Sequence, residues 1–253
     1  MANEFGVLSR VVCYLACSMF VLVACDTGPG AGPDLYEQQR SNLDKKLMTD
    51  SIAGFKAGLT SPASQAAFNT DAPLAGVLLA GGSQPMEAFI HASDYGQLMI
   101  EVEIGFIAGR AITENVGSVE ELRGMISASA PAVELPDLAM PGGDTSVPSL
   151  VRNNVGSHSF IIGASRGAQE DVNAVEVHLY RDDEEITSGN GSDAMGDQWQ
   201  ALLWLVNRTI DSGWTIKPGQ VMITGAMGAM VPGMPGRYRA DFGEFGEINF
   251  SIL

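Results

Sequence analysis

Two glutamates, Glu101 and Glu103, stand in an apolar stretch that runs from Leu98 to Phe106. Apolar and β-branched residues dominate this stretch and alternate with a period of two, which predicts a β-strand. On a strand the two glutamates point to the same face, with their Cα atoms about 6.6–6.8 Å apart. Val102 and Ile104 then point to the opposite face, toward a core.

This pair of carboxylates favours a metal ion. Side by side, the two charges repel each other by about 4 kcal/mol at 4 Å and an effective dielectric constant of 20. A bound cation removes that repulsion, and ligands that are all oxygen favour a hard ion such as Mg²⁺ or Mn²⁺. The alternative is that Glu101 and Glu103 line the solvated face of an edge strand, and the motif alone leaves both interpretations open.

Lys56 is a further charged residue in a strand-like segment, residues 52–62, that is otherwise mostly apolar. It is one of four lysines in a chain of 253 residues. Most lysines in such a place extend their ammonium group to the surface. The alternative is a lysine directed at an anionic substrate.

The composition excludes several classes of protein. Hydrophobic residues make up 45% of the chain, which excludes a disordered protein and a multi-span membrane protein. The formal net charge of −16 argues against nucleic acid or anionic lipid as a partner. The length suffices for one large domain with a buried core.

The first 25 residues predict export. An apolar run of 14 residues, Val11 to Ala24, follows Arg10 and is too short to span a membrane, but it fits a secretory signal. It ends in Leu-Val-Ala-Cys25, which resembles a bacterial lipobox. We therefore expect a signal peptide over residues 1–24, a lipidated Cys25 and a flexible tether to residue 33, which hold the protein on a membrane facing the periplasm or the exterior. All three cysteines lie in this segment, so no disulfide is expected in the rest of the chain.

The remainder, residues 34–253, reads as a single catalytic domain that is rich in strands. A charged and mostly solvated helix is expected over residues 34–51. Pro131 and Pro136 suggest that the strand carrying Glu134 lies at the edge of a sheet or contains a bulge. Because strands do not alternate strictly with helices, the fold class is α+β with a mixed or antiparallel sheet. The expected strands are 52–62, 98–106, 131–137, 159–163, 175–181, 221–224, 237–242 and 247–252, and the further helices are 119–123 and an amphipathic one over 199–210.

Several motifs in this order resemble the 2-oxopent-4-enoate hydratase / 4-oxalocrotonate decarboxylase family of the fumarylacetoacetate hydrolase superfamily. They are Phe55-Lys-Ala-Gly-Leu-Thr60, Glu101-Val-Glu-Ile-Gly-Phe106, Pro131-Ala-Val-Glu134, Asn153-Asn-Val-Gly156, Ser188-Gly-Asn-Gly-Ser-Asp-Ala-Met-Gly196, Lys217-Pro-Gly-Gln-Val-Met-Ile-Thr-Gly225 and Ala240-Asp-Phe-Gly243. The resemblance covers residues 52–252. It implies a mixed β-roll or β-sandwich that forms homo-oligomers.

The resemblance also implies the site. Glu101, Glu103 and Glu134 would hold Mg²⁺ or Mn²⁺ and are catalytic together with Lys56. Substrate would be bound by Lys56, Asn154 and Ser192. A 2-oxo acid can chelate the ion, which then stabilises an enolate as a Lewis acid.

The activity that we expect is a hydro-lyase that adds water to a small 2-hydroxydienoic or 2-oxo-enoic acid. One alternative on the same site is a 2-oxo acid decarboxylase or a C–C hydrolase of acylpyruvates. Another is a lipoprotein that binds a small acid without catalysis, because Asp197-Gln198 stands where the family has His-Pro. Retention of the three glutamates and Lys56 argues against that last alternative.

Overall fold

Two β-sheets, a few helices and many turns make up the chain. The structure is a computed structural model that describes residues 33–168 and 171–253. The helices are α1 (Pro33–Asp44), α2 (Pro62–Ala67), α3 (Val119–Arg123), α4 (Val147–Arg152) and α5 (Gln198–Asp211). The strands are β1 (Ile52–Gly58), β2 (Leu74–Leu79), β3 (Ser83–Gln84), β4 (Phe89–Ile90), β5 (Met99–Ala108), β6 (Ile126–Leu135), β7 (Ser159–Ile162), β8 (Arg166–Gly167), β9 (Glu176–Arg181), β10 (Glu184–Asn190), β11 (Val221–Ile223), β12 (Val231–Pro232), β13 (Gly236–Asp241) and β14 (Glu247–Ile252).

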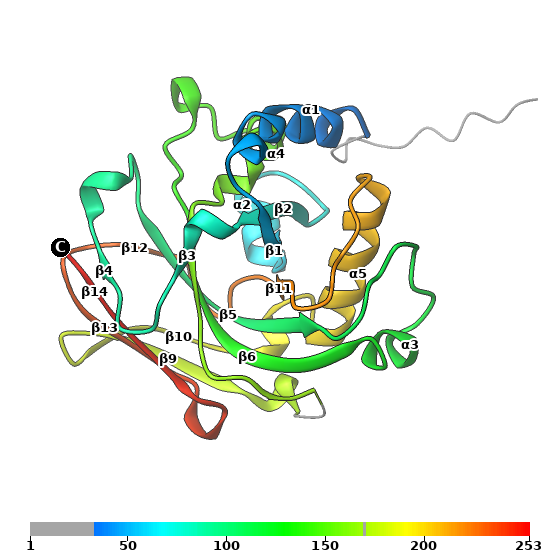
Figure 1. Ribbon diagram of the computed structural model, residues 1–253. Helices are drawn as coiled ribbons and strands as arrows, with labels where there is room; N and C mark the ends of the chain where they lie inside the picture. The colour runs from blue at the N-terminus through cyan, green and yellow to red at the C-terminus, as the bar shows by residue number, and fades with distance from the viewer. Residues whose placement is uncertain (1–32, 169–170) are drawn as a thin grey trace, which may run out of the picture.

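The larger sheet has nine strands and the smaller has five. The larger follows the order β2-β1-β11-β5-β6-β7-β3, with β12 paired to β5 and β8 paired to β6. The smaller follows the order β10-β9-β13-β14-β4. Most neighbours are antiparallel, but β1 and β11 are parallel, so the larger sheet is mixed. In Figure 1 the long strands β5 and β6 curve across the molecule between the smaller sheet and α5. The predicted strand-rich α+β class is confirmed.

One hydrophobic core joins the two sheets. Its buried side chains include Phe55 of β1, Phe106 of β5, Leu179 of β9 and Phe250 of β14. Helix α5 packs against β1, β2 and β11, and α1 packs against α4. Both faces of the middle strands of the larger sheet are therefore covered.

The strand with the two glutamates lies in the interior of the sheet. β5 is hydrogen-bonded to β11 on one side and β6 on the other, which excludes the edge-strand interpretation. Val102 and Ile104 are buried, as expected, but Glu103 is buried as well and Glu101 is half-buried. The face that carries the carboxylates is not a solvated face.

Pro131 lies inside β6 and does not mark an edge. Its carbonyl accepts a hydrogen bond from the Gly163 backbone N–H at 2.8 Å, so the polar atoms of this peptide point away from β5. On that side β6 pairs with β8 before the proline and with β7 after it. Proline has no N–H, and at this position an N–H would point into the gap between β8 and β7. Its absence therefore removes no hydrogen bond between strands.

The first helix is shorter than expected, and one of its faces is buried. Helix α1 ends at Asp44, and its residues Tyr36, Gln39 and Leu43 are buried. The Gln39 amide donates to the carbonyls of Ala75 and Val151 at 2.9 and 3.0 Å. Most of the described residues in this segment are exposed, as predicted, but the predicted extent to residue 51 was wrong and one face of α1 closes over β2 and α4.

Helix α5 begins at a capped turn. The Asp197 carboxylate accepts hydrogen bonds from the backbone N–H groups of Trp199 and Gln200, both at 2.9 Å, and from the Asn173 amide at 2.6 Å. At the other end Gly213 has a φ of +80°, which agrees with the glycine C-cap expected there. The expected apolar face is present, with Trp199, Leu202 and Val206 fully buried.

The predicted signal peptide, Cys25 and the tether lie outside the described residues, except for Pro33, the last residue of the predicted tether, which is the first residue of α1. Within residues 33–168 and 171–253, the helices are all too short or too polar to cross a bilayer.

The N-cap of α5 gives a test of the fold. Asp197→Ala removes the acceptor of two backbone N–H groups, so we expect unfolding to become easier by about 1–2 kcal/mol. For a domain of this size that lowers the Tm by a few degrees. Glu37→Ala, which changes an exposed residue of α1, is the matched control and should leave the Tm nearly unchanged. Equal Tm values for both variants in thermal melts would contradict this account of the helix start.

Candidate active site

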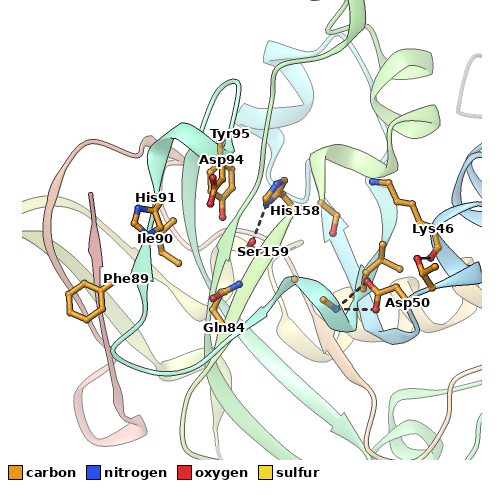
Figure 2. A pocket seen from close by; sticks show the side chains of 15 residues that line it. Lys46, Asp50, Gln84, Phe89, Ile90, His91, Asp94, Tyr95, His158 and Ser159 are labelled. Atoms are coloured by element: carbon orange, nitrogen blue, oxygen red, sulfur yellow. Dashed lines mark hydrogen bonds between the residues drawn. The ribbon is translucent and has the colours of Figure 1, made fainter.

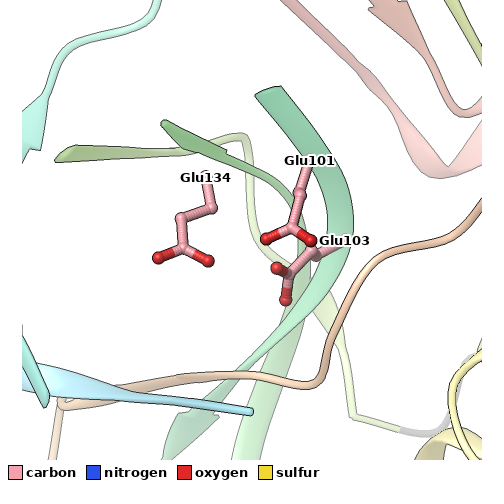
Figure 3. Close-up of side chains that lie close together, drawn as sticks. All are labelled: Glu101, Glu103 and Glu134. Atoms are coloured by element: carbon pink, nitrogen blue, oxygen red, sulfur yellow. The ribbon is translucent and has the colours of Figure 1, made fainter. Parts of the chain in front are cut away.

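Three glutamates from two neighbouring strands meet at one place. Glu101 and Glu103 are two residues apart on β5, and Glu134 on β6 is directly opposite Glu101 in the antiparallel register. Directly opposed residues share a face of the sheet, so the three side chains project to the same side. Figure 3 shows their carboxylates leaning toward one another, and one oxygen from each lies within 4.8 Å of the others.

Lys56 completes this cluster from β1. Its ammonium Nζ lies 2.6 Å from Glu134 Oε2 and donates to the Val155 carbonyl at 3.1 Å. The residue is 1% exposed, so the interpretation that it extends to the surface was wrong. Gly76, its partner on β2, leaves room for the lysine stem, because a Cβ there would lie 3.0 Å from Lys56 Cγ.

An unusual backbone turn presents the carbonyl that Lys56 contacts. Asn154 and Val155 have φ values of +57° and +52°, and a β-branched residue seldom adopts that region. The Asn154 side chain holds the turn in place, since its Oδ1 accepts from the Val77 N–H at 2.7 Å and its Nδ2 donates to the Val77 carbonyl at 2.8 Å. Asn154 therefore secures the turn to β2.

The Glu103 carboxylate is fixed by a glycine. The Gly225 backbone N–H donates to Glu103 Oε2 at 2.6 Å. Gly225 has a φ of +103°, and a Cβ at this position would lie 2.1 Å from Thr60 Oγ1, so no other residue fits. Glu103 Oε1 remains buried without a hydrogen-bond partner, as does Glu134 Oε1.

Burial and repulsion favour the protonated forms of Glu103 and Glu134 when no cation is bound. Burial, which outweighs the attraction of Lys56, raises the pKa of Glu134 to about 7. Burial, together with repulsion by Glu134 and Glu101, raises the pKa of Glu103 well above its usual range. Burial works to lower the pKa of Lys56, but the three carboxylates outweigh it and leave that pKa raised, so the lysine stays charged.

This arrangement fits a divalent cation. Three carboxylates and one ammonium group give the cluster a formal charge of −2 when all four are ionised, which a dication neutralises. The unpartnered oxygens of Glu103 and Glu134 are buried polar atoms that a native site rarely leaves without a partner. An all-oxygen ligand set suits magnesium, manganese or calcium.

A cavity of about 280 Å³ adjoins the cluster. Lys56 and Glu101 form the charged part of its wall. The remaining wall comes from the segment through α2, from the residues around Leu138 and Leu150, and from the loop that follows Gly225. The cavity can hold a small organic acid beside the carboxylates.

A larger hollow, about 550 Å³, lies elsewhere on the surface and is shown in Figure 2. Lys46, Asp50, His91 and His158 are among the residues that line it. In the described part of the chain, the three glutamates are the one group of acidic, histidine or cysteine side chains close enough to share an ion. The adjoining cluster of carboxylates, and not the volume, therefore identifies the smaller cavity as the candidate active site.

The structure does not bring every predicted site residue into this cavity. Ser192 is exposed in the turn after β10, and neither it nor the Asn154 side chain contributes to the cavity wall. A role for these two in substrate binding stays a prediction. Sequence reasoning missed the contributions of Gly76, the Val155 carbonyl and the Gly225 N–H. For Gly76 a signal was available, since a glycine inside an apolar strand, here in the segment 74–79, often marks the close approach of another group.

Comparisons with known proteins place the chain in a family. Residues 65–251 match the family described as fumarylacetoacetate (FAA) hydrolase C-terminal. A 2-keto-4-pentenoate hydratase of Burkholderia vietnamiensis is 30% identical over 214 residues, which cover 81% of this chain and 80% of that protein. A 2-keto-4-pentenoate hydratase of Paraburkholderia phymatum is 29% identical over 86% of this chain and 84% of its own.

Solved structures share the fold. The 4-oxalocrotonate decarboxylase of Pseudomonas putida G7, complexed with magnesium and adipate, aligns with a TM-score of 0.80 at 24% identity over 87% of this chain and 85% of its own. Fumarylpyruvate hydrolase of Pseudomonas aeruginosa, in complex with Mn²⁺ and pyruvate, aligns with a TM-score of 0.62 at 15% identity over 79% of this chain and 88% of its own. The predicted superfamily fold is thereby confirmed.

The buried carboxylates predict an unusual pH dependence of stability. Because their folded pKa values lie above the unfolded ones, the folded protein binds more protons from about pH 4.5 upward, and stability falls as pH rises through the folded values. In EDTA we expect the Tm to drop by at least about 4 °C between pH 5.5 and pH 8, or about 1–2 kcal/mol. Differential scanning calorimetry measures it.

Glu103→Gln tests the cause of that drop. The variant keeps the size of the side chain and removes one charge, so it should raise the Tm in EDTA at pH 8 and flatten the pH dependence. Glu184→Gln, at an exposed position of β10, is the control and should follow the wild type. A wild-type Tm that is constant or rises over this pH range would contradict the proposed crowding of carboxylates.

Proposed function

Because the chain belongs to the fumarylacetoacetate hydrolase family, we propose that it is a hydro-lyase that adds water to a small 2-hydroxydienoic or 2-oxo-enoic acid. The observation that carries this proposal is the cluster of three glutamates and Lys56 beside a cavity of suitable size. Relatives named 2-keto-4-pentenoate hydratase, matched over most of both chains, support this reaction among those of the family.

We include a divalent ion, Mg²⁺ or Mn²⁺, in the proposal, held by Glu101, Glu103 and Glu134. When bound, such an ion acts as a Lewis acid that draws negative charge onto the oxygen of a 2-oxo acid. Of the two Glu103 oxygens, Oε1 has no hydrogen-bond partner, whereas Oε2 accepts the Gly225 N–H. Solved structures of the same fold that hold magnesium or Mn²⁺ support the choice of ion.

Lys56 is the residue of this chain best placed to bind the substrate carboxylate. Its ammonium group is held by Glu134 and the Val155 carbonyl, and it forms part of the cavity wall. A buried and charged ammonium group attracts a carboxylate more strongly than an exposed one. A proton relay by Nζ would require a lowered pKa, whereas the pKa of Lys56 is raised, so the structure favours binding of the carboxylate over proton transfer as the role of this group.

Two other activities on the same site remain as alternatives. A decarboxylase or an acylpyruvate-type hydrolase would use the same glutamates, and a 4-oxalocrotonate decarboxylase of Pseudomonas is 25% identical over 78% of this chain.

A non-catalytic protein was suggested by Asp197-Gln198. In the structure Asp197 caps α5, and the buried Gln198 donates to the Gly191 carbonyl at 2.8 Å and contacts Thr224, so both residues have structural roles.

Export and lipidation at Cys25 belong to this proposal too. They are supported by the apolar run and the lipobox-like residues that precede Cys25. Assembly into homo-oligomers, implied by the resemblance, is likewise proposed. It agrees with exposed apolar side chains near the edge strand β4, Phe89 and Leu253 among them.

Substitution of Lys56 tests the catalytic proposal. Lys56→Met keeps the stem and deletes the charge, so kcat/KM with Mg²⁺ or Mn²⁺ should fall at least tenfold, which is about 1.4 kcal/mol. Turnover is followed by ultraviolet absorbance on a panel of 2-hydroxydienoates and acylpyruvates. Lys217→Met, at the turn before β11, is the matched control. Wild-type activity of Lys56→Met would remove Lys56 from the reaction, and failure of the wild type to hydrate any dienoate would contradict the proposed function.

Substitution of Cys25 tests the anchor. Cys25→Ala removes the thiol that would be lipidated, so the protein should leave the detergent phase in a Triton X-114 partition, or accumulate as an uncleaved precursor. Cys17→Ala, in the expected signal peptide, is the control and should behave as wild type. Wild-type protein found wholly in the aqueous phase would contradict the proposal.

A further inference from the structure

Thr60 lines the cavity beside the glutamates and carries a hydroxyl group without a partner. The residue is 3% exposed, and its hydroxyl makes no hydrogen bond with any group of residues 33–168 and 171–253. A buried hydroxyl without a partner costs free energy, and native proteins seldom leave one in that state without a reason. A molecule bound in the cavity can supply the missing partner.

The other polar side chains of this wall are engaged. The Ser61 hydroxyl donates to Ser64 Oγ at 3.0 Å, and the Ser64 hydroxyl donates to the Ser61 carbonyl at 2.9 Å, both within the cap of α2. Lys56 and Glu101 belong to the charged cluster. Among the described side chains that line the cavity, Thr60 therefore has the one neutral polar group that is open to a bound molecule.

A strained turn holds Thr60 in the wall. Leu59, directly after β1, has a φ of +55°, which a leucine seldom adopts. The Gln65 side-chain amide donates to the Leu59 carbonyl at 3.0 Å, and the Met195 N–H donates to the Thr60 carbonyl at 3.0 Å. Backbone strain that is held by such contacts is concentrated at functional sites. The turn thus fixes Thr60 four residues beyond Lys56 of the charged cluster.

The Thr60 hydroxyl also borders the carboxylates. It packs against Gly225, where a Cβ would lie 2.1 Å from Thr60 Oγ1. The Gly225 N–H in turn donates to Glu103 Oε2 at 2.6 Å. One glycine therefore touches both the hydroxyl and a carboxylate of the cluster, and the hydroxyl lies where the charged part of the cavity wall meets its apolar part.

We propose that the Thr60 hydroxyl holds the water molecule that is added to the substrate. The proposal rests on the function proposed above and deepens it. In that function Lys56 binds the substrate carboxylate and the cation binds the 2-oxo group, so the water is the reactant that still needs a place. Buried water is held by polar groups, and apolar side chains of the wall such as Phe68 and Leu138 offer none. A hydroxyl can accept a hydrogen bond from one O–H of the water, which leaves an oxygen lone pair free to attack carbon.

The addition balances with water as the second reactant. The water oxygen forms a bond to the distal carbon of the double bond that is conjugated with the 2-oxo group. The electron pair of that double bond becomes a C–H bond at the neighbouring carbon, which gains one proton for the one that the water loses. Thr60 gains and loses no proton overall, so its part is to position the water.

Thr60→Val tests the proposal, because valine keeps the size of the side chain and lacks the hydroxyl. The kcat of dienoate hydration with Mn²⁺ should fall at least tenfold, with KM within about twofold of the wild type, since the water and not the substrate loses a partner. Thr60→Ser keeps the hydroxyl and should hold kcat within about threefold of the wild type. Where Thr60→Val does not fold, Thr60→Ala against Thr60→Ser makes the same comparison, because these two variants differ in the hydroxyl alone.

A binding measurement separates the water from the substrate. The acid 2-oxopentanoate is saturated, so it can occupy the site without adding water. Isothermal titration calorimetry on the full chain, saturated with Mn²⁺, should give a Kd for this acid in Thr60→Val within about twofold of the wild type. A general distortion of the site would weaken this binding as well, so an unchanged Kd beside a lowered kcat identifies the water as the group that Thr60 holds.

Thr209→Val is the matched control. Thr209 is buried in α5 with a hydroxyl that also lacks a partner among the described residues, and it does not line the cavity. Its replacement should leave kcat and KM unchanged. Both valine variants should keep or raise the Tm of the ligand-free protein, because each removes a buried hydroxyl that has no partner.

The outcomes separate this inference from the proposed function. A wild-type kcat in Thr60→Val, an equal loss in Thr60→Ser, or a Kd for 2-oxopentanoate that rises as much as kcat falls would each contradict the role in holding water and leave the proposed function standing. A wild type that hydrates no dienoate would contradict the proposed function itself, and this inference with it.

Discussion

The mutual repulsion of three carboxylates in a buried place is the constraint on which the rest of this structure depends. Glu101, Glu103 and Glu134 project from adjacent strands in the middle of a covered sheet, and Lys56 supplies one positive charge among them. One ammonium group does not balance three carboxylates, so the metal-free cluster retains protons or carries excess negative charge. The divalent cation proposed for this site would remove the imbalance.

The surrounding residues keep the cluster in this geometry. Gly76 admits the lysine stem, the strained turn at Asn154 and Val155 presents a carbonyl to its ammonium group, and Gly225 holds one oxygen of Glu103. The Val155 carbonyl and the Gly225 N–H are backbone groups of segments far along the chain from the residues that they contact. The position of the charges is therefore set by the tertiary structure as a whole, which is how a ligand set remains preorganised against its own repulsion.

Much of this could be predicted from the sequence, and the limits have physical causes. The period of two around Glu101 and Glu103 predicted their common face correctly, because alternation is a local property of a strand. It could not show that the glutamate face is buried, since the covering elements come from other parts of the chain. The register that places Glu134 opposite Glu101 is also a tertiary property, and only the resemblance indicated it. The burial of the Lys56 ammonium group depends on its partner Glu134, and the place of the Asn154 side chain depends on its hydrogen bonds to β2. Neither could be inferred from the neighbouring residues in the sequence.

The most direct test of the account is to count manganese ions bound to the protein. Electron paramagnetic resonance of free Mn²⁺ during a titration should show one ion taken up per wild-type chain, and binding at least tenfold weaker in Glu134→Gln, with Glu184→Gln equal to wild type. No uptake by the wild type, or equal uptake by Glu134→Gln, would contradict the claim that the three carboxylates form a metal site.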